Sequence, residues 1–189
     1  PVLEGMLATL SRLGISYDTF TKESRFVVDG TVAKLMETLD GLQISDTADN
    51  GAGFLDLGQR GLKGKTEFFY RRGDGSSLYA TRDVAYHMWK WGESNRLVNV
   101  LGEDHKLQAK QVGLTLEELG QKRPEVLFYS FIKLPEGKMS TRQGNVVFMD
   151  DLLEEAHAQA SAVVRELRPE YDDDKVAQIA EAVGTAAVR

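Results

Sequence analysis

Apolar side chains recur at the spacing of an α-helix in two segments near the start of the chain. The first predicts a helix over residues 2–13, whose apolar positions are Val2, Leu3, Met6, Leu7, Leu10 and Leu13. Gly14 follows at the position where a left-handed residue often ends a helix. The second helix is predicted to start after Asp29-Gly30-Thr31, which is expected to cap it, and carries Val32, Leu35, Met36 and Leu39.

Around these helices the pattern changes to short runs that are rich in turn residues. Residues 17–28 alternate loosely between apolar and polar side chains and predict extended structure. Residues 41–64 are rich in Gly, Asp and Asn, which indicates short strands and turns. Two further strands are predicted at residues 67–72 and 78–80, joined by the turn-forming cluster at residues 73–77. This first part of the chain is therefore expected to be α+β.

The second part of the chain alternates between helices and strands. Helices are predicted over residues 82–91, 105–119 and 150–167, and strands over residues 96–101 and 127–134. Strand, helix and strand in this order, with apolar strands, indicate a parallel sheet flanked by helices, so the predicted class is α/β. In the helix at residues 82–91, we expect His87 and Lys90 on the exposed side.

The composition is that of an ordinary globular protein. The 189 residues are 42% hydrophobic and 28% charged, which disfavours disorder, and no apolar run is long enough to cross a bilayer. The absence of cysteine excludes disulfides and thiolate metal sites, and with three histidines we predict no metal site. A net charge of −6 disfavours a surface that coats nucleic acid generally. Because the chain lacks an initiator methionine and ends inside a helical pattern, we expect it to be a piece of a longer protein.

A short basic loop is the clearest sign of chemistry. Residues 137–142 read Gly-Lys-Met-Ser-Thr-Arg and lie between two apolar runs. Lys138 can act as a mobile point charge, Arg142 offers a fork of donors, and Gly137 lets a ligand approach the backbone closely. This combination suits a polyphosphate. For a short basic loop taken alone, a surface hairpin with two solvated cations is the more common explanation.

A second candidate site lies where a predicted strand runs into a helix, in Asp74-Gly75-Ser76-Ser77-Leu78-Tyr79-Ala80-Thr81-Arg82-Asp83. Thr81 is expected to cap the helix, and Asp83 falls in its first turn, where the helix dipole favours a carboxylate. Tyr79 and Asp83 can face one crevice, and a carboxylate beside a phenol suits a guanidinium or ammonium group. From spacing alone, a helix-capping aspartate and a core tyrosine are the more common explanation.

A third candidate site lies at the end of the strand predicted at residues 96–101. Ligands of open α/β sheets bind beyond the carboxyl ends of the strands. Gly102 can let adenine or ribose lie against the backbone, and Glu103 or Asp104 can accept hydrogen bonds from sugar hydroxyls. One of these two acids can equally serve only to place charge at a helix N-terminus. His105 follows at the mouth of the helix.

Taken together, these motifs resemble the arginyl-tRNA synthetases, which are class I enzymes. Residues 138–142, followed by Gly-Asn-Val-Val, are similar to the family's variant of the KMSKS loop, and residues 74–83 are similar to its D-G-T-S-L-Y-x-T-R-D segment. The resemblance implies catalytic roles for Lys138, Ser140 and Arg142. It implies ATP binding by Gly102, Glu103, Asp104, Lys138, Met139 and Ser140. It implies that the substrate arginine is bound by Tyr79, Asp83 and His105.

The resemblance also implies how the chain is organised. Residues 1–72 would be an α+β insertion within the catalytic domain, residues 73–168 the second half of a Rossmann-like catalytic domain, and residues 169–189 the truncated start of a helical C-terminal region. Two departures stand out. Thr141 occupies the place of a second lysine in the general class I loop, and the H-x-G-H motif of the class is absent from this sequence.

The function implied by the resemblance belongs to a longer parent protein. That protein would activate L-arginine with ATP, with Mg²⁺ arriving on the nucleotide, and transfer the arginine to tRNA(Arg) in the cytoplasm without any membrane association. Because half of the class I site is missing, we predict that this chain alone is inactive. The alternatives are a class I synthetase for another amino acid, a related nucleotidyltransferase, and an ATP-binding module without chemistry.

Overall fold

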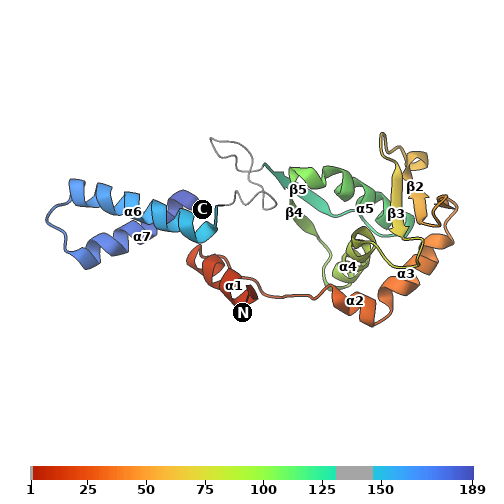
Figure 1. Cartoon of the computed structure of the whole chain (residues 1–189), viewed down its shortest axis with the longest axis horizontal. Helices are drawn as coiled ribbons and strands as arrows, with labels where there is room; N and C mark the ends of the chain where they lie inside the picture. The colour runs from red at the N-terminus through yellow and green to blue at the C-terminus, as the bar shows by residue number, and fades with distance from the viewer. Residues whose placement is uncertain (1, 131–146) are drawn as a thin grey trace. The chain divides into compact units, whose positions relative to one another are not determined.

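The computed structural model describes residues 2–130 and 147–189 and divides the chain into two units (Figure 1). One unit comprises residues 1–20 and 133–189, and the other comprises residues 21–132. The first contains three helices among its described residues, and the second contains the remaining helices and two β-sheets.

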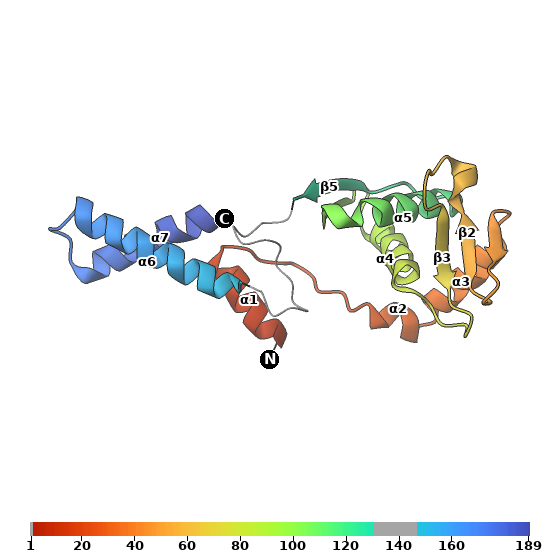
Figure 2. The same cartoon turned by 45° about the horizontal axis from the view of Figure 1, so that its top comes forward.

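The first unit is built on a helical hairpin. Helix α6 (Met149–Leu167) and helix α7 (Asp173–Val188) run side by side in opposite directions (Figure 1, Figure 2). Asp172 caps α7, because its carboxylate accepts a hydrogen bond from the Lys175 backbone N–H at 2.8 Å. Gly184 allows the two helices to approach closely, since a Cβ atom there would lie 2.9 Å from the His157 backbone nitrogen.

Helix α1 (Val2–Arg12) is attached to this hairpin by polar contacts. The Arg12 guanidinium donates to the Glu181 carboxylate of α7 at 3.0 and 3.3 Å, and the Thr9 hydroxyl donates to the Asp150 carboxylate of α6 at 2.9 Å. Gly14 ends α1 with a φ of 67°, as the sequence predicted.

The second unit begins with two helices and a small antiparallel sheet. Helix α2 (Ser24–Val28) and helix α3 (Thr31–Asp40) precede sheet A, whose strand order is β1 (Ser45–Thr47), β2 (Gly53–Asp56) and β3 (Glu67–Arg71). A 3₁₀-helix, η1 (Leu57–Arg60), follows β2. Gly53 cannot be replaced without movement, because a Cβ atom there would lie 2.9 Å from the Tyr70 ring.

Sheet A packs against helices to form the core of the second unit. Phe68 and Tyr70 alternate with exposed neighbours along β3 and are fully buried, as is Leu55 of β2. The Tyr70 hydroxyl donates to the Asp40 carboxylate at 2.6 Å and contacts the Ser45 hydroxyl at 2.7 Å, so this buried polar group is satisfied. The core extends through helix α4 (Tyr79–Glu93) and helix α5 (Lys106–Glu118).

Sheet B is the parallel sheet that the sequence predicted. Strand β4 (Val98–Gly102) pairs in parallel with strand β5 (Glu125–Tyr129), from Val98 opposite Glu125 to Gly102 opposite Tyr129. A short 3₁₀-helix, η2 (Glu103–His105), and α5 connect the two strands, which gives the expected strand–helix–strand unit. The predicted α/β class and the α+β character of the preceding segment are thus confirmed. Residues 131–134 of the predicted second strand lie outside the described residues.

Three local predictions are wrong. Residues 78–80 do not form a strand, since a single bridge between Arg71 and Ser77 is followed by α4 from Tyr79. Thr81 is therefore inside the helix and fully buried, where its hydroxyl donates to the Tyr70 carbonyl at 2.5 Å instead of capping. Residues 24–28 are helical rather than extended, because the turn of α2 places Phe26 against the rings of Tyr86 and Trp89.

Candidate functional site

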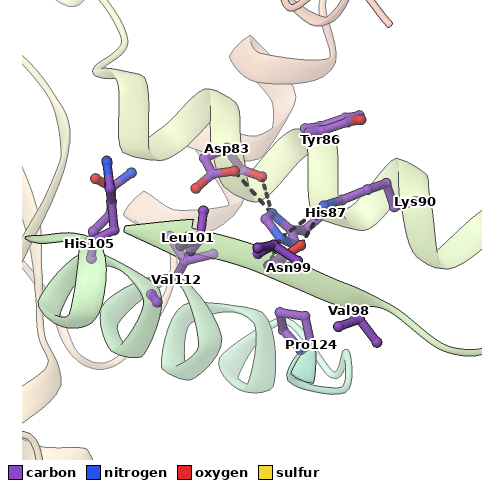
Figure 3. Close-up of a pocket in the computed structure, with 13 residues that line it drawn as sticks. Asp83, Tyr86, His87, Lys90, Val98, Asn99, Leu101, His105, Val112 and Pro124 are labelled. Atoms are coloured by element: carbon purple, nitrogen blue, oxygen red, sulfur yellow. Dashed lines mark hydrogen bonds and ion pairs between the residues drawn. The ribbon is translucent and has the colours of Figure 1, made fainter. Parts of the chain in front are cut away.

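The candidate site is a pocket of about 320 Å³ in the second unit, between α4, β4 and α5 (Figure 3). Its lining comprises Asp83, Tyr86, His87 and Lys90 of α4, Val98–Leu101 of β4, His105, Gln108, Ala109 and Val112 around α5, and Pro124. The pocket therefore joins the helix that follows sheet A to the first strand of sheet B.

The periodicity of α4 explains how it serves both the core and the pocket. Val84 and Ala85 are fully buried in the core. Asp83, His87 and Lys90 recur at intervals of four and three residues, so they share an adjacent face of the helix. Figure 3 shows these three side chains on the side of α4 that faces β4.

His87 is the centre of a hydrogen-bond network in this pocket. The ring is 4% exposed, which corrects the prediction that it lies on the exposed side of the helix. Its Nδ1 atom lies 2.8 Å from the Asp83 carbonyl oxygen and 3.2 Å from Asp83 Oδ1. Its Nε2 atom lies 2.7 Å from the Asn99 side-chain nitrogen and 3.1 Å from Lys90 Nζ.

These contacts determine the tautomer of His87. Both groups near Nε2 are donors, so Nε2 is the acceptor and carries no proton. The proton is then on Nδ1, from which it is donated toward Asp83. The ring thus links the helix residue Asp83 to the strand residue Asn99.

Lys90 brings a half-buried cation to the same pocket. Its ammonium group also donates to Asn99 Oδ1 at 3.1 Å and lies 4.6 Å from the centre of the Tyr86 ring. Burial lowers the pKa of Lys90, and the nearby Asp83 carboxylate opposes that shift. Lys90 was predicted to be exposed, but it is held inside the pocket.

The structure brings only some of the predicted arginine-binding residues into one pocket. Asp83 and His105 both line it. Tyr79 does not; it lies one helical turn before Asp83, with its side chain 70% exposed and the Arg82 guanidinium 4.7 Å from its ring centre. The expectation that Tyr79 ends a strand beside Asp83 is therefore wrong, although the two residues do share one face of α4.

The residues predicted to bind ATP lie at the carboxyl end of β4. Gly102 ends the strand and is buried, and Glu103 and Asp104 follow in η2. Glu103 accepts a hydrogen bond from the Ser130 hydroxyl at 2.7 Å and lies 3.7 Å from Lys106 Nζ. Asp104 Oδ2 lies 3.8 Å from His105 Nε2. These three residues adjoin the pocket through His105 but do not line it.

The basic loop lies outside the described residues. Lys138, Met139, Ser140 and Arg142 all fall in the segment 131–146. The roles that the resemblance implies for these residues thus stay predictions. Among residues 2–130 and 147–189, no three His, Asp or Glu side chains are grouped so as to hold a metal ion, and no helix is long and apolar enough to span a membrane.

Sequence reasoning missed the polar network behind Asp83. The signal that was available is Asn99, a polar side chain within the otherwise apolar run Val98–Leu101. An amide in an apolar strand needs a partner, and His87 and Lys90 on the neighbouring helix provide it.

Comparison with known proteins identifies the family. A family model described as class I tRNA synthetases (R), catalytic domain, matches residues 11–189. The chain belongs to this family. This match does not favour the alternatives, which were a class I synthetase for another amino acid, a related nucleotidyltransferase and an ATP-binding module.

The arginine–tRNA ligase of Methanothermobacter thermautotrophicus is 46% identical to this synthetase chain over 187 residues, which cover 99% of the chain and 32% of that relative. The arginine–tRNA ligase of Methanocella arvoryzae is 48% identical over 188 residues, covering 99% of the chain and 33% of that relative. The chain thus spans about a third of the length of the curated relatives that it matches.

Solved structures support the same fold. The arginyl-tRNA synthetase of Thermus thermophilus matches with a TM-score of 0.81 at 22% identity, covering 99% of this synthetase chain and 37% of its own. The arginyl-tRNA synthetase of Plasmodium falciparum matches with a TM-score of 0.75 at 14% identity, covering 98% and 31%. At these identities the likeness shows the fold, and the predicted fold is confirmed.

Proposed function

We propose that this chain forms part of the catalytic site of an arginine–tRNA ligase, and that its pocket receives the guanidinium group of L-arginine. The carboxylate of Asp83 is the group that would bind it. Asp83 is 36% exposed at its side chain, and one oxygen is held near His87. Its second oxygen, Oδ2, makes no hydrogen bond or ion pair within the part of the chain that the structure describes.

This arrangement suits a planar cation. A guanidinium donates two parallel hydrogen bonds to a carboxylate, which a compact ammonium cannot do. The His87 ring restrains Asp83 on one side, so the acceptor is preorganised before the ligand arrives. His105 lies at the other wall of the pocket and offers a further polar contact to the amino acid. Tyr79, one turn before Asp83, would cover the guanidinium with its ring once Arg82 moves away.

The reaction that we propose needs no protein nucleophile. The carboxylate of arginine attacks the α-phosphorus of ATP; a bond forms between the carboxylate oxygen and phosphorus, and the bond from phosphorus to the pyrophosphate oxygen breaks. Lys138 and Arg142 would neutralise the charge that develops on pyrophosphate, and Ser140 and Met139 would shape the loop around it. A hydroxyl at the tRNA 3′ end then attacks the activated carbonyl, and AMP leaves.

The residues at the end of β4 are the proposed binding site for ATP. Gly102, Glu103 and Asp104 would receive the adenosine part of ATP, because they stand at the carboxyl end of a parallel strand. Mg²⁺ would enter with the ATP phosphates. The substrates are then L-arginine, ATP and tRNA(Arg), and the setting is the cytoplasm, where aminoacylated tRNA is consumed.

The single observation that carries this proposal is Asp83, held by His87 in a pocket of a chain from this family. The test is arginine binding, measured by calorimetry on the full-length ligase that contains this sequence. Asp83→Asn keeps the shape but removes the charge, so we expect arginine binding to weaken roughly 10- to 150-fold, with ATP affinity unchanged.

The matched control is Asp49→Asn, an exposed aspartate on the same unit without a hydrogen bond or ion pair among the described residues. It should bind arginine like the wild type. Arginine affinity within threefold of the wild type in Asp83→Asn would disprove the role of the pocket. We also expect the 189-residue chain alone to show no arginine-dependent exchange of pyrophosphate into ATP, even with tRNA(Arg) present.

A further inference from the structure

A second cavity of about 490 Å³ lies in the same unit, and its lining is strongly basic. It is formed by η1 and the loop after it, by one face of α5, and by the segment that leads to β5. Five of its nine lining residues are cations: Arg60, Lys63, Lys106, Lys110 and Arg123. No acidic residue lines it, although the chain as a whole has a net charge of −6. The basic character is therefore local, and we call this cavity the basic groove.

Two of the cations are held in place by acids outside the groove. Arg60 forms a two-pronged ion pair with Glu118, and Arg123 pairs with Glu117. Both glutamates belong to the last turn of α5. Such pairing orients the guanidinium groups but leaves some of their donors free.

The three lysines of the groove form fewer contacts than its two arginines. Lys106 lies 3.7 Å from Glu103 and 5.8 Å from the centre of the Phe128 ring. Lys63 and Lys110 are exposed, and neither makes an ion pair or side-chain hydrogen bond within residues 2–130 and 147–189. Oriented arginines combined with free lysines are the donor set that binds phosphate oxygens.

The position of the groove relative to the pocket suggests what it binds. His105, Gln108, Ala109 and Val112 line the pocket, whereas Lys106, Leu107, Lys110 and Leu114 line the groove. Because successive helix residues are rotated by about 100°, these two sets lie on opposite sides of α5. The two cavities are thus separated by about one helix diameter, roughly 10 Å.

We propose that the basic groove binds backbone phosphates of the tRNA, next to the pocket where its 3′ end reacts. This inference rests on the proposed function for the identity of the RNA. The volume exceeds what one phosphate group needs, and the cations come from three separate segments, which suits a continuous strand. Contacts to phosphates carry no base specificity, so the groove would position the RNA without selecting its sequence.

The experiment measures binding of a tRNA(Arg) transcript to the full-length ligase by fluorescence anisotropy, without arginine or ATP, over a series of salt concentrations. The test variant is Lys63→Gln with Lys110→Gln, because these lysines make no ion pair or side-chain hydrogen bond in the described part of the chain. At about 0.1 M salt we expect roughly 10- to 30-fold weaker binding. The slope of log K against log salt should fall by about 1.4 to 1.8, for two lost phosphate contacts.

Two further variants control this measurement. Lys22→Gln with Lys34→Gln makes the same change of charge at exposed sites of the same unit outside the groove, and it should bind tRNA within twofold of the wild type. Lys63→Arg with Lys110→Arg preserves the charge and should restore tight binding. A test variant that behaves like the Lys22/Lys34 control would overturn the proposal.

Two competitors of tRNA binding test whether the basic groove binds an acidic protein or a free anion instead of RNA. A polyglutamate peptide that displaces tRNA from the wild type as well as unlabelled tRNA does would assign the groove to an acidic protein partner. Inorganic pyrophosphate that displaces tRNA from the wild type but not from the Lys63/Lys110 variant would assign it to a free anion. Either result would overturn the assignment to RNA. Since arginine is absent from the assay, a failure of arginine binding would leave this measurement interpretable.

Discussion

The two sheets of residues 21–132 differ in how their strands are covered. In sheet A, Leu55, Phe68 and Tyr70 are each at most 2% exposed and belong to one continuous core. In sheet B, one face carries Val98, Val100, Leu127 and Tyr129, which are between 44% and 65% exposed. Parallel sheets are normally covered on both faces, so this face is bare within residues 21–130.

The difference separates the part of the unit that gives stability from the part that carries the site. Helix α4 belongs to both, because Val84 and Ala85 pack in the core while Asp83 and His87 face β4. The rigid core next to sheet A therefore fixes the position of the pocket residues, and the exposed strand β4 supplies Asn99 as the opposite anchor.

The largest expected effect comes from truncating one leucine in each sheet. Leu55→Ala removes a fully buried side chain and should lower the free energy of unfolding by about 2–5 kcal/mol. Leu127→Ala removes a side chain that is 60% exposed and should change it by only about 0.5 kcal/mol. Urea denaturation followed by tryptophan fluorescence measures this, since the two tryptophans, Trp89 and Trp91, both lie in this unit.

Comparable losses from the two substitutions would contradict the contrast between the sheets. They would mean that the face of sheet B is covered in solution. Trp89 provides the fluorescence signal for unfolding. Its ring stacks on the Tyr86 ring at a centroid distance of 5.8 Å, so its fluorescence will change when the core is lost.

A smaller effect is expected at Asn99, where the exposed sheet meets the pocket. Asn99→Ala leaves His87 Nε2 with Lys90 as its partner and should weaken arginine binding to the full-length ligase roughly fivefold, about 1 kcal/mol. The reason is that the ring, held at Nε2 by Lys90 alone, restrains Asp83 less firmly. Calorimetry with arginine and with ATP checks this, and ATP affinity should be unchanged.

Asn95→Ala is the matched control, an exposed asparagine in the loop before β4 without a hydrogen bond among the described residues. Equal loss of arginine and ATP affinity in Asn99→Ala would indicate general damage to sheet B rather than a role in positioning Asp83.

The same contrast explains which parts of the fold could be predicted from sequence. Periodicity located α1, α3, α5 and α6 to within a residue or two, because apolar side chains recur along each segment at helical spacing. It failed at residues 78–80, where the apolar Leu78-Tyr79-Ala80 suggested a strand. Tertiary contacts decided that segment, since burial of Thr81 beneath the Tyr70 carbonyl requires the helix to begin earlier.

The candidate site was predictable in part. Asp83 and His105 come from segments that resemble a known family, and the structure brings them to one pocket. His87 could not be found in this way, because a histidine within an amphipathic helix carries no sign of its depth. Its burial depends on Asn99, twelve residues further along, and no local pattern joins a helix residue to one polar position in the next strand.

The smallest expected effect is a pH dependence at the edge of sheet A. Burial acts to raise the pKa of Asp40, but the hydrogen bonds from Tyr70 and Arg71 outweigh it and lower the pKa below its ordinary value of 3.8. A depressed pKa in the folded state stabilises the fold above pH 3.8, and this contribution is lost as the pH falls from there toward the folded value.

Asp40→Asn should therefore flatten the decline of the unfolding free energy in that acid range, by less than about 1 kcal/mol because the side chain is 44% exposed. Urea titrations at several pH values below 5, with Asp49→Asn as the control, measure the difference. An acid decline that is the same in Asp40→Asn and in the wild type would show that Tyr70 and Arg71 do not stabilise the charged form. The effect belongs to sheet A alone, because the only side-chain partners of Asp40 within residues 2–130 and 147–189 lie on β3.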